Sequence, residues 1–78
     1  MAETAFLLIK LDHNTPAEVA RLLRALPGID EAHAVMGQYD VLAVARTNTT
    51  RDIALLVDAH IRTIEGVTQV VTCVTVPA

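Results

Sequence analysis

The chain carries one short pattern twice. Residues 26–29 (L-P-G-I) return as residues 64–67 (I-E-G-V), 38 positions further along. In each copy an apolar residue stands two positions before a glycine, and a β-branched residue follows the glycine directly. This order is typical of a helix that ends at a left-handed glycine before a strand begins. Two such passages in 78 residues predict two similar strand-helix-strand halves.

The first half begins with a short apolar run at residues 4–11 (T-A-F-L-L-I-K-L), whose brevity and following turn cluster favour a strand. A helix is predicted next, with Thr15 as N-cap, Pro16 at the first helical position and Glu18 completing a capping box. Pro27-Gly28 ends it. One face of this helix is predicted to be buried, and its apolar stripe is Val19, Leu22, Leu23 and Leu26.

A predicted strand at residues 29–36 closes the first half, and a predicted strand at residues 40–46 opens the second half, which repeats the same plan. Thr49 is the predicted N-cap of the second helix, with Asp52 in its first turn, where a carboxylate suits the helix dipole. A valine- and threonine-rich strand at residues 67–76 closes the chain. The predicted stripe of the second helix is Ile53, Leu56, Val57, His60, Ile61 and Ile64.

The resulting element order predicts an α+β fold, the ferredoxin-like βαββαβ sandwich. Right-handed crossovers are expected to place the strands at residues 4–11 and 40–46 in the centre of the sheet as parallel neighbours. Both helices are then expected to cover the same face of the sheet.

The opposite face of the sheet is predicted to be apolar as well. Alternation along the first strand sends Phe6 and Leu8 to one side and Leu7 to the other, and Leu42 and Val44 likewise oppose apolar neighbours. A sheet face in water should instead be polar. A chain of 78 residues buries only about 60% of its unfolded surface, and 53% of its residues are apolar. We therefore expect a symmetric dimer in which the two open faces pack together.

Charge and composition exclude several classes of function. The formal net charge is −3 and the six basic residues are scattered singly, so direct binding to nucleic acid is not expected. With Phe6 and Tyr39 as the only aromatic residues, the sheet offers no stacking platform for RNA. The apolar run 5–9 is too short for a secretory signal or a membrane span. The lone Cys73 excludes an internal disulfide and is predicted to be a packed, inert thiol. A cytoplasmic protein without membrane association is expected.

The histidines do not predict a metal site. His13, His33 and His60 fall in a turn, a strand and a helix, without the ligand spacing of a zinc site. His60 lies on the apolar stripe and is predicted to be a core or interface residue. No arrangement of Cys or Ser with His suggests a nucleophilic enzyme, so no catalytic residue, metal or cofactor is predicted.

The segment Gly37-Gln38-Tyr39-Asp40 joins the second and third predicted strands and allows two interpretations. As a hairpin turn, Gly37 supplies a positive φ, Tyr39 lies on the surface and Asp40 bonds a nearby backbone amide. As a ligand loop, the amides of residues 37–39 receive a carboxylate and Asp40 receives an ammonium group, which are the two charges of a free amino acid. The residue pattern alone leaves both open.

The order of short motifs resembles one known family. P-G-I-x-x-A at residues 27–32, M-G-x-Y-D at 36–40 and G-V-x-x-x-x-T at 66–72 are similar to the effector-binding (RAM) domain of the Lrp/AsnC transcription regulators, over essentially the whole chain. The resemblance implies an antiparallel four-stranded sheet with two helices on one face. It also implies homodimers that assemble through their sheets and then into rings such as octamers or decamers.

In this family a small amino acid binds between neighbouring dimers. The resemblance places its main-chain groups at Gly37, Gln38, Tyr39 and Asp40. Val70 and Thr72 occupy positions where the family often has two hydroxyls, of which only Thr72 is retained. Because the chain begins at the first strand, we expect residues 1–78 to form a single domain without a helix-turn-helix. The expected macromolecular partners are full-length regulators of the same family, and direct binding to DNA is not expected.

The leading hypothesis from the sequence is thus an amino-acid-binding regulatory module whose assembly responds to its effector. Two alternatives remain. One is a dimeric αβ-barrel enzyme, which would need titratable side chains on the sheet, where the strands offer mostly Val, Leu, Ala and Thr. The other is an oligomerisation domain that binds no ligand.

Overall fold

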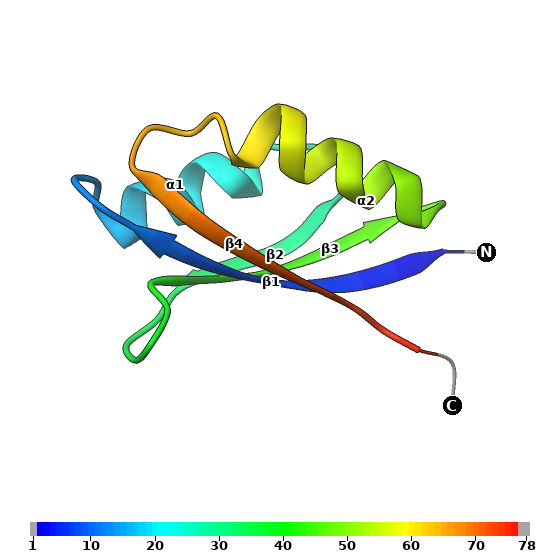
Figure 1. Cartoon of the computed structure of the whole chain (residues 1–78), viewed down its shortest axis with the longest axis horizontal. Coiled ribbons are helices and arrows are strands. Elements are labelled where there is room, and N and C mark those ends of the chain that lie inside the picture. The colour runs from blue at the N-terminus through cyan, green and yellow to red at the C-terminus, as the bar shows by residue number, and fades with distance from the viewer. Residues whose placement is uncertain (1, 77–78) are drawn as a thin grey trace.

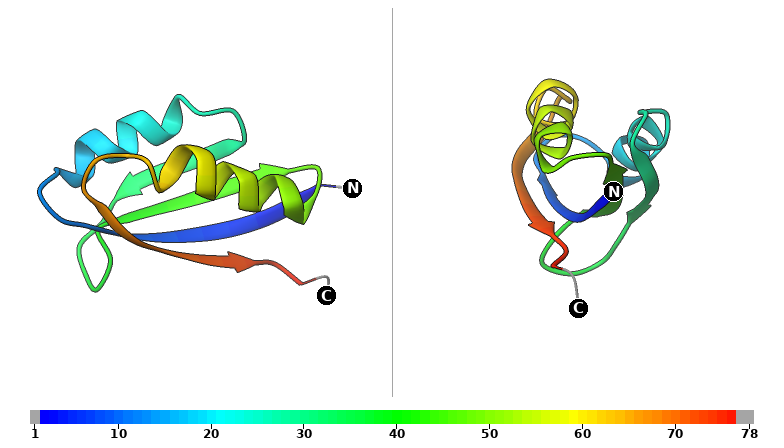
Figure 2. Two further views of the ribbon diagram at one scale, coloured as in Figure 1. Left: turned by 45° about the horizontal axis from the view of Figure 1, so that its top comes forward. Right: turned by 90° about the vertical axis from the view of Figure 1, so that its right-hand side faces the viewer.

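In the computed structural model, which describes residues 2–76, two helical segments lie on one side of a single sheet (Figure 1). The end view in Figure 2 shows both helices above a curved sheet. Within the described residues no helix is long and apolar enough to cross a membrane. The elements are β1 (Glu3–Leu11), α1 (Pro16–Arg24), β2 (Ile29–Ala34), β3 (Val41–Thr47), α2 (Thr50–Leu56), the π-helical turn η1 (Val57–Ile61) and β4 (Val67–Val74).

The strand order is β2-β3-β1-β4, so β1 and β3 are the central strands, as predicted. All three neighbouring pairs are antiparallel, and the prediction that β1 and β3 run parallel is wrong. The reason is topological. The crossover through α1 makes β2 parallel to β1, and the hairpin then reverses the chain, so that β3 enters between β1 and β2 antiparallel to both.

The two helix starts are built differently. Thr49 caps α2 as predicted, because its hydroxyl accepts a hydrogen bond from the amide of Asp52 at 3.1 Å. α1 also begins where the sequence predicts, but the capping box does not form. The amide of Thr15 donates to Asn14 Oδ1 at 2.8 Å, the Thr15 hydroxyl makes no capping bond, and the Glu18 carboxylate pairs with Arg21. The local turn at Asn14 thus replaces the capping box.

The strands are displaced from their predicted bounds at their ends. β2 stops at Ala34 and not at residue 36, β3 covers 41–47 and not 40–46, and β4 stops at Val74. The β2–β3 ladder closes with a bond from the Val35 amide to the Asp40 carbonyl at 3.0 Å, after which residues 36–39 leave the sheet. The apolar Met36 is fully exposed, so apolar character overestimated the length of β2.

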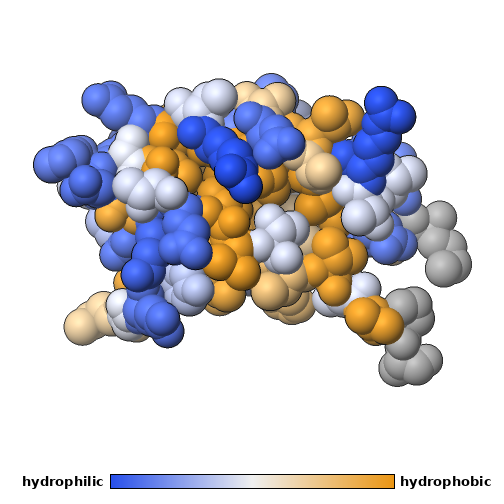
Figure 3. Space-filling model, viewed as in Figure 1, coloured by the Kyte–Doolittle hydropathy of each residue, from blue (hydrophilic) through white to orange (hydrophobic). Residues whose placement is uncertain are grey.

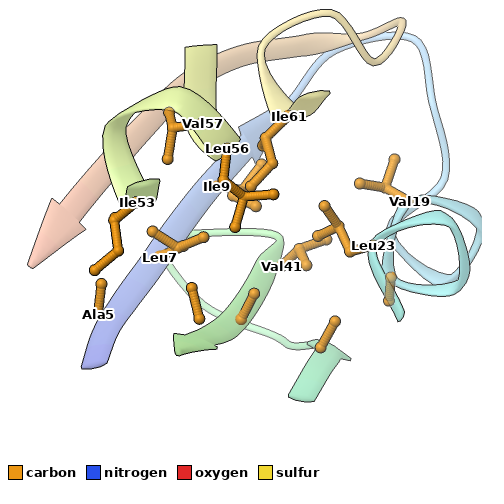
Figure 4. Packing of buried hydrophobic residues seen from close by; sticks show 14 residues of the cluster. Ala5, Leu7, Ile9, Val19, Leu23, Val41, Ile53, Leu56, Val57 and Ile61 are labelled. Atoms are coloured by element: carbon orange, nitrogen blue, oxygen red, sulfur yellow. The ribbon is translucent and has the colours of Figure 1, made fainter. Parts of the chain in front are cut away.

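The core lies between the sheet and the helices. Leu7 and Ile9 of β1 point toward Ile53, Leu56 and Ile61 of the second helical segment, as Figure 4 shows. The residues buried in this core are Ala5, Leu7, Ile9, Val19, Ala20, Leu23, Ala32, Val41, Ala43, Ala45, Ile53, Leu56, Val57 and Ile61. Of the predicted stripe of α1, Leu22 remains 37% exposed and Ala20 is buried in its place.

The π-helical turn changes which side chains the second helical segment buries. The amide of Arg62 donates to the carbonyl of Val57 at 2.9 Å, five residues back, instead of the usual four. The wider turn alters the face that later residues present, so Ile61 is buried whereas His60 is exposed. His60 is therefore not a core residue of the protomer, and the alternative, a histidine at an interface, stays a prediction.

The two glycines of the repeated pattern both adopt positive φ, 95° at Gly28 and 90° at Gly66, as predicted. Their surroundings differ. A Cβ at Gly28 would meet its nearest atoms at 3.5 Å, whereas a Cβ at Gly66 would lie 2.5 Å from the carbonyl oxygen of Asp12. The amide of Asp12 also donates to the Gly66 carbonyl. The start of β4 is thus clamped against the β1–α1 connection.

Candidate functional site

The connection between β2 and β3 projects from the sheet on the side away from the helices (Figures 1 and 2). At its tip Gly37 has φ 147°, and no atom of any residue other than Gly37 and its two chain neighbours lies within 4 Å of the position its Cβ would take. The amides of residues 37–39 donate no hydrogen bond to any residue between 2 and 76. Open space and free donors together make this loop a candidate receiver for an anionic group.

Asp40 fastens this loop to β1. Its Oδ2 accepts a hydrogen bond from the amide of Leu11 at 2.8 Å, and its own amide donates to the carbonyl of Ile9 at 2.9 Å. The β1–β4 pairing shifts register just there, between Lys10 and Leu11, so the carboxylate satisfies an amide at an irregular point of the ladder. The turn interpretation is confirmed in this respect: Asp40 bonds a backbone amide.

Tyr39 is half-buried, and its ring contacts Lys10. The Lys10 Nζ lies 5.9 Å from the ring centroid, within the range of a cation–π interaction. Lys10 belongs to β1, so this contact holds the loop against the neighbouring strand. Sequence reasoning missed Lys10. A single cation within the apolar run of residues 4–11 was the available signal, but only the register shows that it lies beside the loop.

The two predicted site residues of β4 lie elsewhere. Val70 pairs with Ile9 and Thr72 pairs with Leu7, both of which point into the core, so Val70 and Thr72 lie on the helix-covered side of the sheet. Strand β1 separates them from β3 and from the loop. Within one protomer the structure therefore brings the four loop residues together but does not join Val70 or Thr72 to them.

The face of the sheet without helices, called the open face below, carries Phe6, Leu8, Leu42, Val44 and Val71. Phe6 is 43% exposed and the other four are half-buried. Cys73 faces Phe6 across the β1–β4 pair and is exposed, so the prediction of a packed thiol is wrong for the protomer. Figure 3 shows hydrophobic side chains also reaching the surface across the middle of the molecule, over β4, between hydrophilic ends.

A cleft of about 440 Å³ lies at the other end of β3, between the end of α1 and the second helical segment. Asp52 and His60 border it, together with the apolar Leu55. Sequence reasoning did not predict it. Among the described residues, no group of three His, Cys, Asp or Glu side chains could hold a metal ion.

One ion pair on the surface, between Glu18 and Arg21, shifts the pKa values of both residues. The Arg21 guanidinium donates to the Glu18 carboxylate, which lowers the pKa of Glu18 and raises that of Arg21. Both residues belong to α1. The pair thus lies on the helix layer of the molecule, whereas the β2–β3 loop projects from the opposite side of the sheet.

Residues 4–76 match the protein family described as the Lrp/AsnC ligand binding domain. The chain belongs to this family. A relative from Pyrococcus horikoshii, named as an uncharacterised HTH-type transcriptional regulator, is 38% identical over 77 residues. That match covers 95% of this chain and 51% of the relative, so the chain spans about half of that regulator's length.

Solved structures share the fold. A protein from Thermus thermophilus is 29% identical with a TM-score of 0.90, over 97% of this chain and 95% of that one. A transcriptional regulator from Neisseria meningitidis, described as a complex with L-Met, is 17% identical with a TM-score of 0.81, over 96% of this chain and 50% of that one. At that identity the second likeness concerns the fold alone.

Proposed function

We propose that this chain is an amino-acid-binding regulatory module that acts in transcriptional control through effector-dependent assembly, and not as an enzyme. The observation that carries the proposal is the loop at residues 37–40, which combines free amides, an open glycine and an anchored carboxylate. Membership of a ligand-binding family supports it, as does the L-Met bound to the Neisseria regulator of the same fold.

The proposed assembly has two levels. Two protomers bury their open faces against each other, because that face exposes apolar side chains such as Phe6 at the surface of a small domain. The loops at the rim of each dimer then meet a further dimer, and the effector binds where they meet. Val70 and Thr72 contribute only if the neighbouring dimer brings them there. A ligand that binds the ring and not the free dimer stabilises the ring by its differential affinity.

The experiment is native mass spectrometry of the purified chain with each of the twenty L-amino acids in turn. Assembly that depends on an amino acid supports the proposal. Assembly that no amino acid changes indicates the purely structural oligomerisation domain, and a dimer that turns over a substrate indicates the αβ-barrel enzyme. A monomer under every condition contradicts both levels of assembly.

The site is tested with Asp40→Asn. This change removes the charge but keeps an oxygen that can accept the Leu11 amide, whereas alanine would also release the end of β1. The variant is expected to remain a dimer and to lose the amino-acid response, because an ammonium group binds a carboxylate far more strongly than an amide. Asp58→Asn on the exposed surface of η1 is the matched control and is expected to respond normally. A normal response of the Asp40 variant removes residue 40 from the site.

A further inference from the structure

The register of the sheet brings two opposite charges to facing positions at the end of the open face. β1 pairs with β3 up to Ile9 and Val41, so the next facing positions are Lys10 and Asp40. Ile9 points into the core, and alternation therefore directs Lys10 to the open face. On its other side Lys10 pairs with Gln69 of β4, which is exposed. The three residues form a polar row that ends the apolar open face.

A lysine and an aspartate at facing positions would ordinarily pair with each other. Here they form no ion pair. The Lys10 ammonium lies over the Tyr39 ring, and the Asp40 carboxylate accepts from the Leu11 amide. Lys10 and Asp40 therefore each have a partner within the chain, but neither partner neutralises the charge. The Tyr39 ring has no net charge, and the Leu11 amide is a neutral donor that occupies only Oδ2 of Asp40. The row keeps a cation and an anion apart next to an open loop.

We propose that Lys10 binds the carboxylate of the effector while Asp40 binds its ammonium group, with the Gln69 amide beside them. This inference rests on the proposed function and specifies its ligand as a zwitterion with both main-chain charges. Lys10 adds a full positive charge to the free amides of residues 37–39, and a charged donor bonds a carboxylate more strongly than a neutral one does. Amides or esters of the same amino acid, which lack the carboxylate, are poor ligands.

The test compares three probes in the wild-type chain: the amino acid that gives the largest assembly response among the twenty, its α-amide and its N-acetyl derivative. The amide lacks the anionic end and the N-acetyl derivative lacks the cationic end. The wild-type chain is expected to bind the free amino acid at least about tenfold more tightly than either derivative, as loss of one charge-assisted contact implies. Equal binding of the free amino acid and its amide overturns the role of Lys10.

Variants separate charge from packing. Lys10→Met keeps the length and apolar stem of the side chain but removes its charge, so affinity for the free amino acid should fall about tenfold and affinity for the amide should not change. Lys10→Arg should retain most of the preference for the free amino acid over its α-amide. Arg51→Met, which removes one exposed positive charge on α2, is the matched control for net charge. Circular dichroism checks that each variant is folded.

The outcomes distinguish the two proposals. If the wild-type chain responds to none of the twenty amino acids, the proposed function fails and this inference fails with it. If the wild-type chain responds but Lys10→Met keeps the full preference for the free amino acid, only the assignment of Lys10 is overturned. If Lys10→Met weakens the free amino acid and the amide equally, Lys10 supports the fold of the loop and does not read the carboxylate.

Discussion

Both faces of the sheet have an apolar centre, but the side chains of these two centres have different environments. On the helix-covered face Leu7 and Ile9 are fully buried, whereas on the open face Phe6, which immediately precedes Leu7, is 43% exposed. The helices of the same chain cover one face, and we propose that another protomer covers the apolar centre of the other. Under this proposal, alternate residues of β1 serve folding and assembly separately.

The comparison also explains where polar residues are placed. The helix-covered face contains no buried charged or polar residue among those described. On the open face, polar side chains surround an apolar centre. The row of Asp40, Lys10 and Gln69 lies beside the projecting loop, His33 faces Leu42 on the β2 side, and Arg46 faces Thr4 at the other end. The row of Asp40, Lys10 and Gln69 adjoins the apolar centre of this face, so under the proposed function a ligand bound there influences assembly.

The largest expected effect is loss of core packing. Leu7→Ala leaves a cavity under α2 and should lower the free energy of unfolding by about 2–5 kcal/mol, much of the total for a domain of this size. Urea denaturation followed by circular dichroism measures the loss, which should be the same at all protein concentrations. Leu8→Ala, one residue along on the open face, is the matched control. At high dilution it should lower the free energy of unfolding by less than Leu7→Ala does. Equal losses at high dilution would contradict the difference between the faces.

The second effect is on assembly. Leu8→Glu places a carboxylate on the open face and should raise the Kd of the dimer at least about a hundredfold, because an unpaired charge in an apolar interface costs several kcal/mol. Analytical ultracentrifugation over a dilution series measures the change. Leu55→Glu, at a 53% exposed leucine of α2, is the control and should leave the dimer intact. A Leu8→Glu variant that dimerises normally would place the interface elsewhere.

A smaller effect is expected at Cys73, which reports on coverage of the open face without any substitution. The thiol is exposed in the protomer, opposite Phe6. If a second protomer covers this face, alkylation by iodoacetamide should slow several-fold as protein concentration rises, because the thiol reacts only when the face is open. Mass spectrometry of the intact chain follows the reaction. A rate that does not depend on concentration would mean that the face stays uncovered.

The smallest effect on stability is expected for the Glu18–Arg21 ion pair of α1, which belongs to neither face of the sheet. The Arg21 guanidinium lowers the pKa of Glu18, so the pair stabilises the folded chain above the ordinary glutamate pKa, and this contribution disappears as pH falls through the lowered value. Glu18→Gln should therefore lower Tm slightly at neutral pH and not at all in acid. Thermal melts at both pH values test this, and a large difference at neutral pH would contradict the exposed position of the pair.

Sequence reasoning succeeded where local chemistry decides. The glycine terminators, the Thr49 cap, the element order and the apolar side chains on both faces of β1 and β3 follow from residue type and spacing. It failed where an alternative local bond competed, as at Thr15, or where one added residue in a helical turn changed the exposed face, as at His60. For the site, it predicted the loop at residues 37–40 but not the partners of that loop.

The sequence by itself determined which elements form and which family the chain belongs to, because turns, caps and alternation depend on neighbours along the chain. Only the tertiary structure decided the direction of β1 relative to β3, the anchoring of Asp40 to Leu11 and the position of Lys10 over Tyr39. These features join residues nearly thirty positions apart. Such contacts are set by strand order and register, and no local pattern records them.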